Sequence, residues 1–296
     1  MKHGVLGPGG VGGLIGAVLG AAGEEMTLIV RPGTAKIYPA QLSLQSPFGN
    51  VRAPVRVVER MENQLDVLWI TVKSLQLNES LQNIAEDLKV STVVPLLNGI
   101  YHVEALRKRF RRDVVLPATI AVESERVAPG EIIQRSTFVK VAISASAKER
   151  LDAPLQIFRN FGFEVSLVED EATLLWRKLV FLAPTALSTS AAMGSVGEVR
   201  SDPERAKLLE ACVREACVVA TAEGAQVSAD TVIAAIHGLP GGMRSSMEKD
   251  VAAHKIPELD AIAGPILDGA AKHGIEIPAT KELVAAVRAL AAKKLV

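Results

Sequence analysis

The first thirty-one residues constrain what this chain can fold into more than any other segment. A short apolar run at 3–6 leads into a glycine-rich turn, and a small-residue stretch at 13–23 and a second apolar run at 26–30 follow. The turn reads Gly7-Pro8-Gly9-Gly10-Val11-Gly12. This order predicts strand, Gly-x-Gly-x-x-Gly turn, helix and strand, which together form the opening unit of a dinucleotide-binding domain.

Each glycine of this motif has a physical task. Gly7 permits the tight turn, Gly9 lets a pyrophosphate approach the backbone, and Gly12 lets the helix pack closely on the strand. The N–H groups and the positive dipole end of the following helix then face the phosphates. We therefore expect residues 7–12 to hold a dinucleotide cofactor, with a turn of purely structural role as the alternative.

Arg31 ends the second predicted strand and bears on the choice of dinucleotide. NAD-binding domains usually place Asp or Glu at this point to hold the ribose 2′-hydroxyl, whereas an arginine suits a 2′-phosphate. No carboxylate stands beside Arg31 in the sequence. We therefore predict NADP(H) as the cofactor; a solvated charge at a strand end is the alternative for this residue.

The same segment has features of a membrane or export signal. Residues 4–23 carry no charge, glycines at 12, 16 and 20 are spaced as in packed membrane helices, and Lys2 precedes the run. However, Pro8 and the clustered glycines interrupt it, and it continues into strand-like sequence. No other uncharged stretch reaches the ~20 residues that a bilayer requires. We therefore expect a soluble cytoplasmic protein that does not contact the membrane.

Composition excludes several further classes of partner. The 296 residues include 33 Lys and Arg and 33 Asp and Glu, so the formal net charge is zero and no nucleic-acid surface is expected. Cys212 and Cys217 lie five apart and would point to different faces of a helix, which argues against a disulfide. No Cys/His spacing typical of a metal site occurs, so we predict no metal.

Short apolar runs alternate with helical patterns in the first half of the chain. Strands are predicted at 55–58, 67–72, 93–97, 114–122, 132–134, 139–144 and 165–168. Helices fit between them, for example over 75–88 and 103–110. This alternation predicts a doubly wound, mainly parallel α/β sheet of Rossmann type. Residues 128–131 would join an antiparallel hairpin on the edge of that sheet.

From residue 169 onward the pattern becomes almost entirely helical. Helices are predicted at about 170–192, 203–223, 228–236, 245–253, 257–273 and 279–293, with Gly and Pro at their ends. We predict a Rossmann-type dinucleotide-binding domain over 1–168 and an all-helical substrate and catalytic domain over 169–296. The cleft between two such domains is the expected active site.

Lys73 and Asn98 follow two of the predicted strands, at the sheet edge where ligands of open α/β proteins bind. A strand-end cap and an Asn-Gly turn are their structural alternatives. Lys178 has apolar neighbours at helical spacing: Leu174, Leu175, Phe181 and Leu182. Desolvation there would lower its pKa and suit it to proton donation, whereas a snorkelling lysine is the alternative.

Two further polar residues open predicted helices. Ser245 and Glu248 form a capping box, which leaves Ser246 as an extra hydroxyl at a positively polarised helix end. Ser246 is therefore a candidate contact for a substrate carboxylate. Glu258 follows Pro257 in the first turn of the next helix, where a carboxylate is also favourable for the helix itself.

Together these residues resemble the ketopantoate reductase family. The matching segments are Gly7 to Gly12, Arg31, Thr71 to Ser74, Leu97 to Gly99, Pro129 to Ile132, Trp176 to Leu179, Ser245 to Asp250 and Glu258 to Asp260. They span nearly the whole chain in the order of the family. The resemblance implies NADPH-dependent reduction of 2-dehydropantoate (ketopantoate) to pantoate, a step toward pantothenate and coenzyme A.

The resemblance also implies a role for each matching residue. Lys178 would be the catalytic lysine, which hydrogen-bonds the ketone oxygen and protonates it as hydride arrives from the nicotinamide. Asn98 would orient this lysine, the substrate and the cofactor. Ser246 would contact the carboxylate or the carbonyl of the substrate. Glu258 would contact the substrate's terminal hydroxyl and the lysine, and Lys73 would line the crevice near the cofactor and the substrate.

The chain departs from the family pattern on the helix of Lys178. Characterised members carry asparagines four and eight residues after the catalytic lysine, where this chain has Leu182 and Ala186. Each missing amide removes a hydrogen bond worth on the order of 1 kcal/mol net. A reductase of a less polar ketone or 2-oxo acid is therefore one alternative, and a non-catalytic NADP(H)-binding sensor is another. The identity of the small-molecule substrate and the oligomeric state, with a homodimer as one possibility, stay open at this point.

Overall fold

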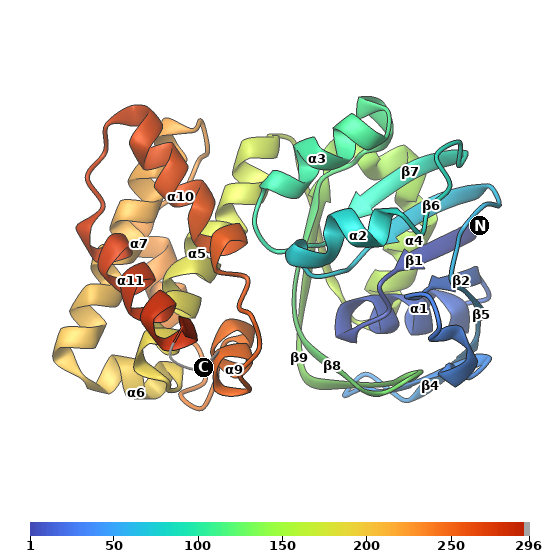
Figure 1. Ribbon diagram of the computed structural model, residues 1–296, viewed down its shortest axis with the longest axis horizontal. Coiled ribbons are helices and arrows are strands. Elements are labelled where there is room, and N and C mark those ends of the chain that lie inside the picture. The colour runs from blue at the N-terminus through green and yellow to red at the C-terminus, as the bar shows by residue number, and fades with distance from the viewer. Residues whose placement is uncertain (293–296) are drawn as a thin grey trace. The chain divides into compact units, whose positions relative to one another are not determined.

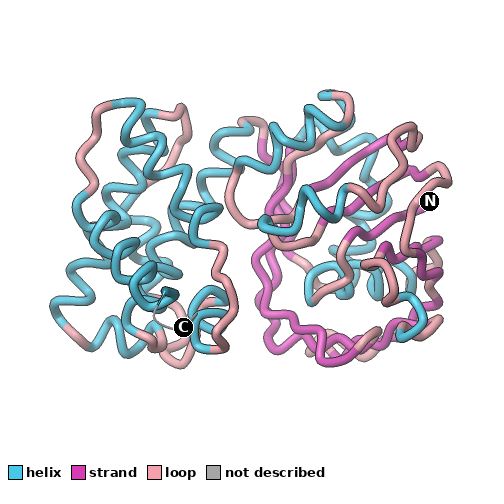
Figure 2. The backbone as a smooth tube through the Cα atoms, viewed as in Figure 1, coloured by secondary structure: helices cyan, strands magenta, loops and turns pink. Residues whose placement is uncertain are grey.

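The computed structural model describes residues 1–292, which form two compact units. The first unit comprises Met1–Leu97 and His102–Leu174, and the second comprises Asn98–Tyr101 and the chain from Leu175 onward. All described strands lie in the first unit (Figure 2). Because neither unit is a continuous piece of chain, the predicted ranges 1–168 and 169–296 remain a proposal about folding domains.

The first unit contains a five-stranded parallel sheet in the order β5-β2-β1-β6-β7. Its strands are β1 (Lys2–Leu6), β2 (Glu25–Ile29), β5 (Arg56–Val58), β6 (Leu65–Ile70) and β7 (Val90–Pro95). β1 has β2 on one side and β6 on the other, so the strand order reverses at β1. Ligands of open α/β sheets bind at the carboxyl end of such a switch point, and here that end leads into the glycine turn.

A second five-stranded sheet was not predicted as a separate layer. It follows the order β10-β9-β3-β4, with β8 paired to β9. Its strands are β3 (Gln41–Gln45), β4 (Val51–Pro54), β8 (Ala118–Ala128), β9 (Glu131–Ser144) and β10 (Glu164–Val168). The antiparallel hairpin around 128–131 is confirmed, but it belongs to this second sheet and not to the edge of the first.

Helix α1 (Gly10–Ala21) lies against strands of both sheets, and Figure 1 shows it beside β4, β8 and β9. Four of its glycines, at positions 10, 13, 16 and 20, face the second sheet. A Cβ at Gly13 would stand 2.3 Å from Ile132, and one at Gly20 would stand 2.9 Å from Ala53. The small residues therefore bring this helix close to the sheet. None of the helices described within residues 1–292 combines the length and the hydrophobicity that a membrane span requires.

The remaining helices of the first half differ in part from the prediction. They are α2 (Leu77–Leu81), α3 (Tyr101–Arg109) and α4 (Lys148–Phe161). The helix predicted over 75–88 is wrong beyond Leu81, because the backbone at Asn83 and Ala85 pairs with Met61 instead of continuing the helix. No helix was predicted at α4, which ends at Gly162 with a φ of 112°.

The second unit is built of helices and begins within α5 (Glu171–Ala192). The others are α6 (Val196–Ser201), α7 (Pro203–Ala222), α8 (Ala229–His237), α9 (Ser246–Ala252), α10 (Leu259–His273) and α11 (Pro278–Ala292). Every predicted helix of this region is present, and α6 is additional. Cys212 and Cys217 are free and buried on α7. The all-helical architecture predicted after the sheet is thus confirmed.

Candidate active site

The glycine turn joins β1 to α1 in the conformation that its sequence predicts. Gly7 has a φ of +83°, and a Cβ there would stand 2.3 Å from Val72. A Cβ at Gly12 would stand 2.3 Å from Thr71, whereas one at Gly9 would meet nothing closer than 4.0 Å. The turn is therefore closed on its packed side and open at Gly9. This geometry fits a dinucleotide whose pyrophosphate lies against the backbone at the start of α1.

Arg31 and Lys73 are both exposed, beyond the carboxyl ends of β2 and β6, the two strands that flank β1 in the first sheet. Arg31 follows β2, and its carbonyl accepts hydrogen bonds from the amide and the hydroxyl of Thr34. Lys73 precedes a short 3-10 turn at Ser74–Gln76. Their exposure leaves both cations accessible to a ligand at this edge of the sheet.

Sequence reasoning missed a carboxylate near Arg31. Glu59, just after β5, accepts a hydrogen bond of 3.0 Å from the backbone amide of Ala35, in the loop that Arg31 begins. The amides of Ala35 and Gly33 lower the pKa of Glu59. The carboxylate therefore holds the loop through its backbone. Glu59 lies far from Arg31 in the sequence, so no local pattern revealed it. The pairing of β2 with β5 brings the ends of these two strands together.

Three of the predicted site residues meet within the second unit. Lys178 on α5 donates a hydrogen bond of 3.0 Å from Nζ to Asn98 Oδ1. Asn98 Nδ2 in turn donates one of 3.1 Å to Glu258 Oε2, at the start of α10. Lys178 and Asn98 are half-buried, and Glu258 is buried. We name this chain of side chains the Lys178–Asn98–Glu258 triad.

The environment of the triad changes the acidity of its lysine. Burial lowers the pKa of Lys178 from 10.5 to about 8, and the Glu258 carboxylate opposes this by favouring the ammonium form. Desolvation outweighs the attraction. A primary amine with a pKa about 8 is still largely protonated at neutral pH, yet it gives up a proton far more readily than an ordinary lysine does.

The other predicted substrate contacts have different settings. Leu182, one turn after Lys178 on α5, is half-buried, and Ala186, one further turn along, is fully buried. Ser246 is the first residue of α9 and is exposed. The cap of α9 is Ser245, whose hydroxyl accepts from the amide of Glu248 at 3.1 Å.

The loop that carries Asn98 is anchored to α10. Gly99 has a φ of +80°, and a Cβ there would stand 2.2 Å from the carbonyl oxygen of Ala261. Tyr101 donates a hydrogen bond to Asp268, and its ring packs on Gly264, where a Cβ would stand 3.2 Å away. These contacts place Asn98 in the same compact unit as Lys178 and Glu258. The geometry of the triad is therefore set inside one unit.

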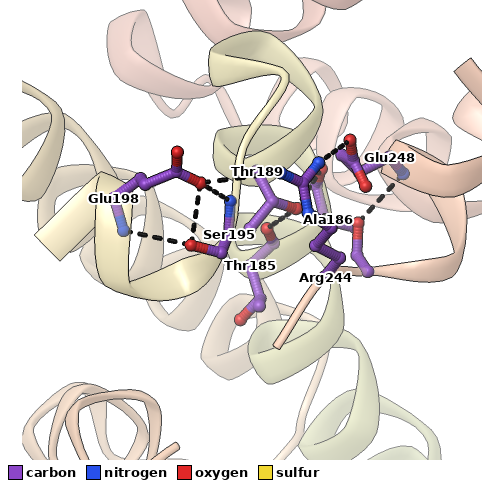
Figure 3. A network of polar contacts seen from close by, with 8 residues as sticks. Thr185, Ala186, Thr189, Ser195, Glu198, Arg244 and Glu248 are labelled. Carbon is purple, nitrogen blue, oxygen red and sulfur yellow. Dashed lines mark hydrogen bonds and ion pairs between the residues drawn. The ribbon is translucent and has the colours of Figure 1, made fainter. Parts of the chain in front are cut away.

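A polar network missed by sequence reasoning joins α5, α6 and α9 (Figure 3). The Thr189 hydroxyl lies 2.8 Å from that of Ser245, and it also donates to the Thr185 carbonyl at 2.8 Å. Arg244 pairs with the buried Glu248 at 2.7 Å. The network fixes the start of α9, one residue away from Ser246. The threonines four residues apart on α5 are the sequence signal that could have shown it.

The fold and these side chains define a class of protein. A glycine turn suited to a dinucleotide, combined with a helical unit that holds a lysine of lowered pKa, is the arrangement of a nicotinamide-dependent oxidoreductase acting on CH–OH groups. Family models described as "Ketopantoate reductase PanE/ApbA" and its C-terminal part match residues 3–147 and 172–291. The chain belongs to this family, and it is a 2-oxo acid reductase that uses a nicotinamide cofactor.

Individual relatives cover the chain almost completely. The chain is 31% identical to a 2-dehydropantoate 2-reductase of Caulobacter vibrioides, over 97% of this chain and 98% of that protein. A PanE/ApbA family ketopantoate reductase from Ralstonia eutropha superposes with a TM-score of 0.85 at 24% identity, over the full length of both chains. A D-mandelate dehydrogenase solved with NADH and anilino(oxo)acetate does so with a TM-score of 0.86 at 22% identity, again over the full length of both.

Proposed function

We propose that this protein catalyses the NADPH-dependent reduction of 2-dehydropantoate to pantoate, a step of pantothenate and coenzyme A biosynthesis. The observation that carries the proposal is the Lys178–Asn98–Glu258 triad, with Lys178 Nζ 3.0 Å from Asn98 Oδ1 and a lysine pKa lowered to about 8. The relative from Caulobacter vibrioides, 31% identical, is named as an enzyme of this activity.

The chemistry assigned to the triad is proton donation to a ketone oxygen. When bound, the cofactor supplies a hydride to the carbonyl carbon. Lys178 donates one N–H to the carbonyl oxygen and transfers that proton as negative charge develops there, which leaves a neutral amine that regains its proton from water. Asn98 Oδ1 accepts another N–H of the ammonium and thereby fixes the direction of the other N–H donors of Lys178.

Glu258 has two parts in this proposal. Its carboxylate favours the ammonium form of Lys178, which keeps the proton donor charged at neutral pH. One oxygen accepts from Asn98, and the other is assigned to the hydroxyl group of the substrate. Ser246, exposed at the first residue of α9, is assigned to the substrate carboxylate, and Lys73 to the crevice near the cofactor.

We further infer that NADPH is preferred over NADH. The support is the exposed Arg31 after β2, because an arginine at this point suits a 2′-phosphate. Direct titration of the protein with NADPH and with NADH tests this. An Arg31→Ala variant is expected to bind NADPH at least about tenfold more weakly and NADH nearly as well as the parent protein. Unchanged affinity for NADPH would contradict the assignment of Arg31.

The substrate is tested by steady-state rates over a panel of 2-oxo acids with NADPH. The expected result is the highest kcat/KM for 2-dehydropantoate, and a loss of at least about a thousandfold in kcat for Lys178→Met. Arg177→Met, which alters the adjacent exposed cation on α5, serves as the matched control and should retain activity. Tight NADPH binding without turnover of any panel member would instead favour a non-catalytic sensor.

A second candidate substrate class follows from α5. Leu182 and Ala186 stand one and two turns beyond Lys178 and offer no hydrogen bond to a polar substrate. We propose, as the alternative, a 2-oxo acid or ketone with a larger apolar substituent; a dehydrogenase of the same fold has been solved with anilino(oxo)acetate. A higher kcat/KM for phenylglyoxylate than for 2-dehydropantoate would select this alternative.

Light scattering of the purified protein distinguishes a homodimer from a monomer.

A further inference from the structure

The end of strand β8 lies directly on the glycine turn of the first unit. Ser124 Oγ donates a hydrogen bond of 2.9 Å to the carbonyl of Gly10. A Cβ at Gly10 would stand 2.2 Å from the carbonyl oxygen of Ser124, so the two backbones are in close contact. Residues just after Ser124 on this strand are therefore held beside the turn that is suited to the cofactor.

Arg126, two residues further along β8, reaches the same turn through Tyr38. Its guanidinium donates to the Tyr38 hydroxyl and lies 5.9 Å from the centre of the Tyr38 ring. The Tyr38 hydroxyl in turn donates to the carbonyl of Pro8, at 3.5 Å. Two kinds of contact, a hydrogen bond and a cation–π interaction, thus fix the position of the cation.

Tyr38 and Arg31 belong to one loop segment, residues 31–38, that follows β2. The segment is closed by hydrogen bonds from Thr34 to Arg31 and from the Tyr38 amide to the carbonyl of Ala35, at 3.1 Å. Glu59 holds its middle through the Ala35 amide. Arg31 stands at one end of this short segment, and Tyr38, with Arg126 upon it, stands at the other.

The charges around Arg126 leave its guanidinium available to an anion. Its neighbour Glu125 is paired with Arg135 at 2.6 Å, and Glu59 accepts from the loop backbone. A guanidinium has five N–H donors in a fork that matches a phosphate, and the contact with the neutral Tyr38 hydroxyl occupies one of them. Arg126 itself is exposed.

We propose that Arg126, held by Tyr38, is a second cationic contact for the 2′-phosphate of the cofactor, acting together with Arg31. The inference rests on the proposed preference for NADPH and adds a residue that lies 95 positions from Arg31 in sequence. Backbone amides at the start of α1 serve the pyrophosphate, whereas a 2′-phosphate adds negative charge that arginine side chains bind most strongly. Tyr38 is a positioning residue in this scheme.

The test measures binding with ligands that differ only by the 2′-phosphate. Calorimetric titrations compare 2′,5′-ADP with 5′-ADP, and NADPH with NADH, for the parent protein, Arg126→Met and Tyr38→Phe. We expect Arg126→Met to weaken the two 2′-phosphorylated ligands about tenfold and the other two less than twofold. Tyr38→Phe, which keeps the ring and removes the hydroxyl, should give a smaller loss of the same selectivity.

Lys140→Met is the matched control, because it removes an exposed cation from the same hairpin while Arg135 still pairs with Glu125, and it should leave all four affinities unchanged. Equal weakening of 5′-ADP by Arg126→Met, or no weakening of any ligand, would overturn the role of Arg126. A parent protein that binds 2′,5′-ADP no more tightly than 5′-ADP would overturn the NADPH preference itself, and the inference with it. Melting temperatures of each variant verify that it is folded.

Discussion

Replacing Lys178 by methionine is expected to change how the stability of the protein depends on pH. In the folded chain, burial lowers the pKa of this lysine from 10.5 to about 8. In the unfolded chain the amine is solvated and keeps its ordinary value. Between these two values the unfolded state therefore binds more protons than the folded state, and the stability contributed by Lys178 rises with pH.

The size of the effect follows from the two pKa values. A difference of about 2.5 in pKa corresponds to about 3 kcal/mol. Below pH 8 both states are protonated, and the folded state bears this whole cost of a buried ammonium. By pH 9.5 the folded state has lost its proton and about 2 kcal/mol of the cost is removed, while the methionine variant bears none at either pH.

Urea unfolding at pH 7.0 and pH 9.5, followed by far-UV circular dichroism, measures this difference. The free energy of unfolding of the parent protein, relative to Lys178→Met, should rise by about 2 kcal/mol between the two pH values. Leu182→Met, a substitution without charge one turn along α5, should show the same pH dependence as the parent. A difference between parent and Lys178→Met that stays constant with pH would refute a lowered lysine pKa in the folded state.

Three further predictions concern the triad, its loop and the first strand. Glu258→Gln removes the charge that raises the pKa of Lys178, so the alkaline limb of the kcat/KM profile should move from about pH 8 to lower pH, as steady-state rates would show. Gly99→Ala, with a φ of +80° and its Cβ 2.2 Å from the Ala261 carbonyl, should lower the free energy of unfolding by about 1–3 kcal/mol in urea titrations. Burial lowers the pKa of His3, so the unfolded state binds more protons near pH 6 and stability should fall as the pH decreases below about 6.5; His3→Gln should weaken that fall.

Local patterns predicted the parts of the fold that local chemistry determines. The glycine turn and the strands on either side of α1 follow from the conformational needs of Gly7 and Gly12, which the sequence displays directly. β3 escaped prediction although Gln41–Gln45 alternates apolar and polar residues; it lies between β4, which follows it closely in sequence, and the distant β9. The end of α2 escaped because Asn83 and Ala85 bond to the backbone of Met61, which no local pattern reveals.

The candidate site shows the same division between local and long-range information. Apolar residues at helical spacing around Lys178 left a desolvated lysine and a snorkelling lysine as alternatives, and in the folded chain burial lowers the pKa of this lysine. The hydrogen bond from Asn98 to Glu258 joins residues 160 positions apart, so spacing alone could not reveal it. The contacts of Thr189 with Ser245 and of Arg126 with Tyr38 likewise join residues that lie far apart in the sequence.

Residues 98–101 belong to the second unit, although the chain on both sides of them belongs to the first. This has a consequence for how the chain can be recombined with its relatives. A fragment that starts at Leu175 would contain Lys178 and Glu258 but not the amide that joins them. A chimera that takes its C-terminal half from another family member would combine one parent's loop with the other parent's α10. Viable exchanges must therefore inherit residues 98–101 together with residues 258–268, which comprise Glu258 and the first part of α10. A single crossover within α5 would separate these two segments, whose contacts require them to come from the same parent.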